Sequence, residues 1–220
     1  MSSYNINYFL IHCDEHIERI DNIINLQNII NQQLYVFKGY YTKNIDTDYN
    51  SKLQYLKAFD KNLKLKKNVL FKSGEIGCYL SHHMLIKDIL SSSNDKDYSV
   101  IFEDDVTCKE TLHENIGKII QNMYRKQLDW DIIFLGNLTK NHSEKVIHNI
   151  YTIDKNNVCT GTHALLINNK NIQKMYDTNC NISNAIDFQY KKNIDNSKLN
   201  GYVIFPPICF QNKIFHSNIQ

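Results

Sequence analysis

Short apolar runs alternate with longer segments of helical periodicity along most of this sequence. The apolar runs lie at 8–11, 34–37, 98–102, 130–136 and 202–205, and the helical patterns at 17–30, 73–91 and 112–124. Continuous apolar runs are typical of strands buried on both faces, and helices between such strands provide the crossovers of a parallel sheet. We therefore predict an α/β fold with a Rossmann-like, mostly parallel central sheet flanked by helices.

The length of 220 residues and the lack of an internal repeat or long linker predict a single domain, 1–220. The formal net charge of +2 argues against a nucleic-acid binder with a broad basic surface. The N-terminus lacks the pattern of a signal peptide, and no apolar stretch is long enough to form a transmembrane segment. Six cysteines without a Cys-x-x-Cys pair indicate reduced thiols, so we expect a cytoplasmic location. The abundance of Asn, Ile, Lys and Tyr indicates AT-biased coding, as in a low-GC bacterium, a protist or a large DNA virus.

The strand predicted at 98–102 runs directly into Glu103, Asp104 and Asp105. Open α/β sheets bind ligands at the carboxyl ends of their strands. Three adjacent carboxylates raise one another's pKa unless a cation is present, and Mn²⁺ or Mg²⁺ prefers oxygen ligands and also binds diphosphates. The alternative is an acidic turn that faces solvent. The position of the three carboxylates directly after a buried strand favours a metal-binding site at the edge of the sheet.

The segment 73–82 reads Ser-Gly-Glu-Ile-Gly-Cys-Tyr-Leu-Ser-His and opens a helical pattern. Gly74 allows another group to approach the backbone, and the N-terminus of a helix attracts anions. Glu75 has a simpler interpretation as a partner of the helix dipole, and His82 as a structural residue. By itself this segment identifies no function.

Taken together, the two segments resemble glycosyltransferase family 25, which includes bacterial lipopolysaccharide glycosyltransferases and the galactosyltransferases of collagen hydroxylysine. The order is that of the family: the Gly-Glu-x-Gly-Cys-x-Leu-Ser-His segment, then a hydrophobic strand that ends in Glu-Asp-Asp-Val. Further features also occur in the family's order: Arg19 after the first strand, the Gly-Thr strand at 160–167, Asp187 and a C-terminal Pro…Gln…Ser pattern. The first strand ends in Ile11-His12-Cys13, where the family usually has Ile-Asn-Leu.

The resemblance implies a GT-A type fold, with a nucleotide-sugar-binding part at about 1–106 and an acceptor-side part at about 107–220. It implies a UDP-sugar donor, with UDP-galactose first and UDP-glucose second, Mn²⁺ or Mg²⁺ as cofactor, and inversion at the anomeric carbon. The acceptor would be a hydroxyl group of a glycan or of a protein, such as hydroxylysine.

The resemblance also assigns roles to particular residues. Asp187 is the expected catalytic base and Glu103 a second catalytic residue that orients the loop or touches the donor. The expected metal ligands are Asp104, Asp105 and His216. The expected donor-binding residues are Ile11, His12, Arg19, Gly74, Glu75, Ser81, His82, Asp104 and Gln211.

Three other interpretations remain open from the sequence. One is a protein that keeps the GT-A type fold and binds a nucleotide sugar without transferring it. Another is a metal-dependent phosphoesterase or nucleotidyltransferase that uses the same acidic strand end. The third is an interaction protein with a solvated acidic turn. For Asp187, the alternative is a favourable position in the first turn of a helix that starts near 183.

Overall fold

Eight strands form one sheet through the middle of the chain, in the order β2-β1-β4-β9-β6-β11-β8-β7. The computed structural model describes residues 4–42, 48–67, 69, 71–92, 96–138, 144–153 and 161–215. The sheet consists of β1 (Ile6–His12), β2 (Leu34–Lys38), β4 (Tyr98–Glu103), β6 (Ile132–Phe134), β7 (Lys145–Ile147), β8 (Ile150–Thr152), β9 (Ala164–Asn168) and β11 (Gly201–Ile204). β9 runs antiparallel to β4 and β6, and β8 runs antiparallel to β11 and β7. The other six strands point in one direction, which confirms the predicted α/β fold with a mostly parallel sheet.

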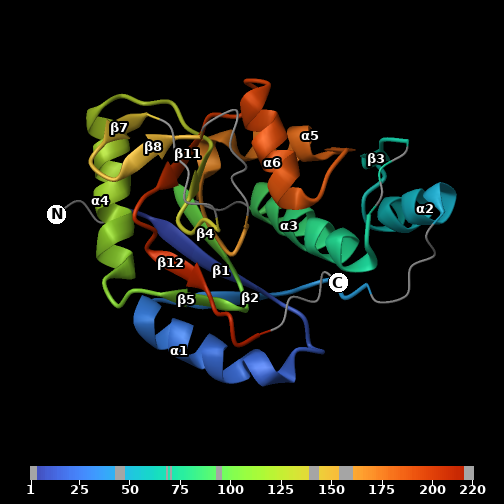
Figure 1. Cartoon of the computed structure of the whole chain (residues 1–220), viewed down its shortest axis with the longest axis horizontal. Coiled ribbons are helices and arrows are strands. Elements are labelled where there is room, and N and C mark those ends of the chain that lie inside the picture. Colours follow the sequence, from blue (N-terminus) through green and yellow to red (C-terminus); the bar gives the residue numbers. More distant parts are fainter. Residues whose placement is uncertain are drawn as a thin grey trace.

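Helices cover both faces of this sheet (Figure 1). A short 3-10 helix, η1 (Ile17–Arg19), α1 (Ile20–Ile30) and α4 (Leu112–Arg125) lie on one face. The other face carries α3 (Ser73–Ser91), α5 (Ile172–Asn179), which follows the 3-10 helix η2 (Asn169–Asn171), and α6 (Ile186–Asp195), with α2 (Tyr49–Phe59) at its end. Each face has its own buried core. Within the described residues, we find no helix that combines the length and the apolar character needed to cross a membrane.

Two short ribbons lie outside the main sheet, and the sequence analysis predicted neither of them. β3 (Lys64–Leu65) pairs in parallel with β10 (Asn181–Ile182). β5 (Val106–Cys108) pairs in antiparallel fashion with β12 (Cys209–Gln211). Because β5 starts directly after the acidic segment, this second ribbon brings the C-terminal part of the chain to the end of β4.

The helix predicted at 17–30 is present as η1 and α1, but only part of its apolar periodicity is buried. Ile17 and Ile24 are 71% and 55% exposed, whereas Ile30 is buried. Arg19 and Leu26 are buried as well, and Asn22 donates hydrogen bonds to the chain that follows β4. The polar end of β4 requires donors at this place, so the helix turns a partly polar face toward it. Asp14, which precedes η1, forms an ion pair with Lys38.

Gly77 allows α3 to pack closely against the segment that follows β2. A Cβ atom at this position would lie 2.3 Å from the carbonyl oxygen of Tyr40 and 2.7 Å from Oγ1 of Thr42. Contacts of that length are forbidden, so the helix would have to move away from the segment. The second glycine of the 73–82 segment therefore has a packing reason.

We expect Gly77→Ala to lower the free energy of unfolding by roughly 1–3 kcal/mol, although alanine has the higher helix propensity. Gly117→Ala on α4 is the matched control, because its Cβ would lie 4.0 Å from the nearest atom, Cδ2 of Tyr4. That control is expected to gain roughly 0.5–1 kcal/mol. Urea denaturation followed by circular dichroism measures both, and a Gly77→Ala protein as stable as wild type would refute the close approach.

Candidate active site

The three carboxylates that follow β4 reach different surroundings because successive strand residues point to opposite faces of a sheet. In β4, Val100 and Phe102 belong to the core beneath α1 and α4, whereas Ile101 belongs to the core beneath α3. The alternation continues beyond these apolar residues. Glu103 contacts α3, and Asp104 contacts the segment that leads into α1.

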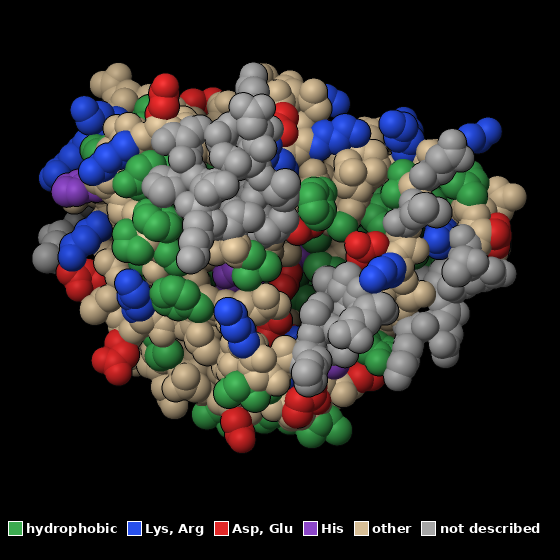
Figure 2. Space-filling model, viewed as in Figure 1, with side chains coloured by type: hydrophobic (Ala, Val, Ile, Leu, Met, Phe, Trp, Pro, Cys, Tyr) green, Lys and Arg blue, Asp and Glu red, His purple; other side chains and the backbone are tan. Residues whose placement is uncertain are grey.

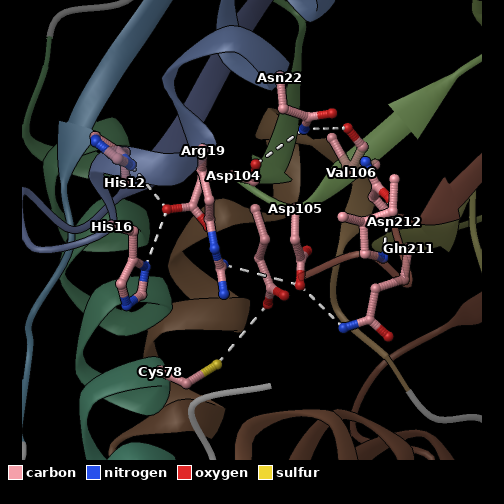
Figure 3. Close-up of polar contacts among 12 residues, drawn as sticks. His12, His16, Arg19, Asn22, Cys78, Asp104, Asp105, Val106, Gln211 and Asn212 are labelled. Atoms are coloured by element: carbon pink, nitrogen blue, oxygen red, sulfur yellow. Dashed lines mark hydrogen bonds and ion pairs between the residues drawn. The ribbon is translucent and has the colours of Figure 1, made fainter. Parts of the chain in front are cut away.

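Asp104 is surrounded by potential positive charge. Its Oδ1 accepts a hydrogen bond from Nη1 of the buried Arg19, and its Oδ2 lies 2.8 Å from Nδ1 of His12 and 3.3 Å from Nδ1 of His16. Asn22 donates to the carbonyl oxygen of Asp104, at 2.9 Å, and to that of the residue after Asp105, at 2.8 Å. Figure 3 shows His12, His16 and Arg19 around the carboxylate of Asp104. The predicted residues His12, Arg19 and Asp104 are therefore in direct contact.

Glu103 joins the two sequence segments on which the resemblance was based. Its Oε1 lies 2.9 Å from Nε2 of His82, accepts a hydrogen bond of 2.6 Å from Oγ1 of Thr162, and lies 3.8 Å from Sγ of Cys78. Burial opposes ionisation of Glu103, but the contacts with His82 and Thr162 outweigh it and lower its pKa to about 2. Glu103 is therefore ionised at neutral pH and held in place.

Asp105 is the carboxylate whose charge is least balanced. Its Oδ2 accepts a hydrogen bond of 2.9 Å from Nε2 of Gln211 and lies 3.9 Å from Nη1 of Arg19. Its other oxygen, Oδ1, is buried and has no hydrogen-bond partner among the described residues. Burial, together with the negative charges of Glu103 and Asp104, raises the pKa of Asp105 to about 6. Figure 2 shows acidic side chains in a hollow near the middle of this face of the molecule.

The donor atoms at Asp105 fit a hard divalent cation. Carboxylate and amide oxygens are the ligands that Mn²⁺ and Mg²⁺ prefer, and Asp105 offers a buried oxygen that lacks a partner within the described part of the chain. The oxygens of Asp104, by contrast, are already engaged with Arg19 and the two histidines. The third predicted ligand, His216, lies outside the described residues.

A second set of possible metal-ligating side chains lies next to the acidic segment. Donor atoms of Cys78, His82 and Glu103 all lie within 4.8 Å of one another, a mixture of sulfur, nitrogen and oxygen that suits Zn²⁺. His82 and Glu103 already satisfy each other, and burial raises the pKa of Cys78, so the thiol is neutral. This set therefore fits Mn²⁺ less well than the oxygen atoms at Asp105.

Other predicted donor-binding residues serve the fold in this structure. Glu75 accepts the N–H of Lys72 at 2.8 Å, which satisfies the first turn of α3. The Ser81 hydroxyl donates to the carbonyl oxygen of Gly77 and accepts the N–H of Tyr40. Ile11 is buried in the core beneath α3. Within the described ranges, no hydrogen bond or ion pair joins Gly74, Glu75 or Ser81 to the three carboxylates.

Asp187 lies in the first turn of α6, on the same side of the sheet as Glu103. Its Oδ2 accepts the N–H of Gly161 at 3.3 Å, and its Oδ1 accepts the N–H of Phe188 at 2.8 Å. Burial raises the pKa of Asp187, and the charge of Glu103 adds to the shift. A carboxylate with a raised pKa is a better proton acceptor than an exposed one.

A cavity of about 480 Å³ adjoins the N-terminus of α6. Residues 66–75 contribute two lysines, Phe71 and Glu75, and residues 183–188 contribute Phe188, which is 45% exposed. The cavity therefore combines an aromatic surface with polar groups, and it lies next to Asp187 in the sequence. The residues that line it come from both predicted parts of the chain, the nucleotide-sugar-binding part at about 1–106 and the acceptor-side part at about 107–220.

The sequence analysis missed four residues that complete these contacts: His16, Asn22, Cys78 and Thr162. Two of them had a usable signal, because Asn22 follows Arg19 by three residues and Cys78 precedes His82 by four, which places each pair on one helix face. His16 and Thr162 had no such signal, since each reaches the site from a loop that the spacing does not specify.

Comparison with known proteins gives consistent matches. The sequence model of glycosyltransferase family 25 (LPS biosynthesis protein) matches residues 5–190. Procollagen galactosyltransferase 2 from Homo sapiens is 28% identical over 108 residues, which are 48% of this chain and 17% of that protein. Inactive glycosyltransferase 25 family member 3 from Mus musculus is 32% identical over 73 residues, 33% of this chain and 12% of that protein.

The chain thus spans less than a fifth of the length of these curated relatives. Among solved structures, the apo-form glycosyltransferase GlyE from Streptococcus pneumoniae TIGR4 aligns over 90% of this chain and 45% of that chain. Its sequence identity is 12% and its TM-score is 0.40.

Asp105 destabilises the folded chain at neutral pH when no cation is bound. Its pKa is about 6 in the folded chain, against an ordinary value of 3.8. The folded state therefore binds the proton more tightly than the unfolded state. The stability that protonated Asp105 contributes is fully present below about pH 4 and is lost as the pH rises through about 6.

We expect Asp105→Asn to raise the free energy of unfolding by about 1–3 kcal/mol near pH 7.5 with a chelator present. The gain should disappear at about pH 4, where wild-type Asp105 is protonated. Asp104→Asn is the control, because it deprives the buried Arg19 of its counter-ion and should lower stability by roughly 3 kcal/mol. Thermal melts across this pH range measure both, and a lower melting temperature of Asp105→Asn near pH 7.5 would contradict the argument.

Proposed function

The chain belongs to glycosyltransferase family 25, and we propose that it transfers a hexose from a UDP-sugar to a hydroxyl group of a glycan or protein. UDP-galactose is the donor we favour. The observation that carries the proposal is the junction at Glu103, where the 73–82 segment meets the acidic end of β4. Asp105, with its unsatisfied buried oxygen, lies beside this junction.

The donor diphosphate needs positive charge as it leaves, and this chain has few arginines to supply it. Arg19 is paired with Asp104, and the remaining arginine, Arg125, lies in the last turn of α4. We propose that Asp105 holds Mn²⁺ or Mg²⁺, with Glu103 beside it. A bound cation of this kind supplies Lewis-acid compensation of the diphosphate charge.

Arg19, His12 and His16 have a different task in this proposal. They hold the Asp104 carboxylate and, through it, the turn that carries Asp105. Gln211 holds Asp105 from the opposite side by its 2.9 Å hydrogen bond. The chain thereby keeps a charged group in place before the donor binds, which lowers the reorganisation needed during the reaction.

We propose Asp187 as the base that accepts the proton of the acceptor hydroxyl. Its raised pKa suits that role, and two backbone N–H groups orient its carboxylate. The acceptor would enter through the cavity beside α6, where the exposed ring of Phe188 offers an apolar surface for a sugar or a side chain. Attack from this side, opposite the leaving diphosphate, gives inversion at the anomeric carbon.

The purified protein incubated with UDP-galactose and Mn²⁺ is expected to release UDP, and a chelator should stop the release. Asp105→Ala should lower the rate by about 100-fold or more, because the charge that holds the cation is lost. Asp21→Ala, which removes an exposed carboxylate of α1, is the matched control and should leave the rate unchanged. UDP-glucose in a parallel reaction reports the preference for the hexose.

The products separate this proposal from its alternatives. Release of phosphate or pyrophosphate instead of UDP would indicate a phosphoesterase or nucleotidyltransferase. Binding of UDP-galactose without turnover on any acceptor would indicate a binding protein, in keeping with relatives whose names call them inactive. An Asp105→Ala protein with full activity would exclude the metal-binding role of this residue.

Asp187→Asn is expected to lower kcat by about 100-fold or more while the KM for the donor changes little, since the proton acceptor is lost and the donor contacts remain. The wild-type rate should fall as the pH drops through the raised pKa of Asp187. Asp187→Glu, which keeps a carboxylate, should retain part of the activity. If Asp187 only stabilises the helix terminus, Asp187→Asn would lose about 0.3–1 kcal/mol of stability and no activity.

A further inference from the structure

Two cysteines face each other across the β5–β12 ribbon, next to the candidate active site. Cys108 and Cys209 are direct partners in the antiparallel register. Their Sγ atoms lie 3.2 Å apart. Both are thiols in this structure.

The hydrogen bonds of the ribbon define the geometry of this pair. The N–H of Lys109 donates to the carbonyl oxygen of Ile208 at 3.2 Å, and the N–H of Asn212 donates to that of Asp105 at 2.7 Å. Hydrogen-bonded and non-hydrogen-bonded pairs alternate along an antiparallel ladder, so the pair one step inside the Lys109 bond is a non-hydrogen-bonded pair. In such pairs the Cα atoms are about 4.5 Å apart, which lies within the range of about 4.4–6.8 Å that disulfides require.

The two thiols differ in accessibility in a way that suits stepwise exchange. Cys108 is half-buried, whereas Cys209 is fully buried in the core beneath α1 and α4. A soluble disulfide therefore meets Cys108 first. Cys209 then lies within reach of the Cys108 sulfur without any movement of the backbone.

We propose that Cys108 and Cys209 form a reversible disulfide by exchange with a small-molecule disulfide such as oxidised glutathione. The Cys108 thiolate attacks one sulfur of oxidised glutathione, forms a mixed disulfide and releases one glutathione thiolate. The Cys209 thiol, whose pKa burial raises well above its usual value, gives up its proton as its sulfur attacks the Cys108 sulfur, and the second glutathione takes up that proton and leaves as a thiol. The protein loses two hydrogen atoms in total and one oxidised glutathione becomes two reduced ones.

This disulfide would act on the candidate site through the ribbon. β5 starts directly after Asp105, and β12 ends in Gln211, whose amide holds the Asp105 carboxylate. A covalent link between the strands keeps Gln211 and Asn212 in contact with Asp105. It also closes a long loop of the chain, 108–209, and long loops give disulfides a large stabilising effect.

The test uses the full chain equilibrated with oxidised or reduced glutathione, quenched with an alkylating reagent and digested with trypsin. The oxidised sample is expected to contain the peptides 97–109 and 199–213 joined by a disulfide, since each peptide carries a single cysteine. Its melting temperature should exceed that of the reduced sample by about 5 °C or more. These readouts do not depend on transferase activity, so they test the disulfide independently of the proposed function.

Cys108→Ser should abolish both the joined peptides and the temperature shift, whereas Cys13→Ser, at another half-buried cysteine, should keep both. Cys209→Ala should accumulate glutathione on Cys108, because the resolving thiol is missing. Should that buried substitution fail to fold, Cys108→Ser and the wild-type peptide map still decide the matter. Wild-type protein that carries only a glutathione adduct on Cys108, or stays fully reduced at every ratio of oxidised to reduced glutathione, would overturn the proposal.

Discussion

The ion pair between Arg19 and Asp104 is the interaction on which this site depends. Three adjacent carboxylates at the end of a buried strand repel one another, and burial removes the water that would screen them. The chain resolves the conflict by giving each carboxylate its own partners: Arg19 and two histidines for Asp104, His82 and Thr162 for Glu103, and Gln211 for Asp105. Of the three carboxylates, Asp105 is the one whose negative charge is least balanced.

The strand-and-helix order could be predicted from the sequence because apolar runs and helical periodicity are local signals. The end of β4 was also predictable, since three acids after an apolar run are hard to place anywhere but at the edge of a sheet. The buried face of η1 and α1 was not. The isoleucines at 17 and 24 follow the helical periodicity, but this segment turns Arg19 and Asn22 toward the end of β4, and that orientation is set by residues more than 80 positions away.

The β5–β12 ribbon shows a second limit of local patterns. Strands of three residues are too short to carry a periodicity, and their pairing joins positions 106–108 with 209–211. Gln211 was expected near the donor because of the family resemblance, and the ribbon gives the physical means: it carries Gln211 across the molecule to Asp105. Contacts of that sequence separation are set by tertiary packing, and no window of the sequence contains them.

Relatives in the same family carry names that call them inactive, so catalysis has to be argued from the site. Function resides in the site, and the energetics of the site are informative. A purely structural turn would gain from a neutral side chain at position 105, where burial and two neighbouring carboxylates oppose ionisation. A group that destabilises the fold and has a buried oxygen without a hydrogen-bond partner among the described residues is typical of a functional site. The carboxylate at position 105 therefore supports the proposal that this chain binds a cation and a sugar donor.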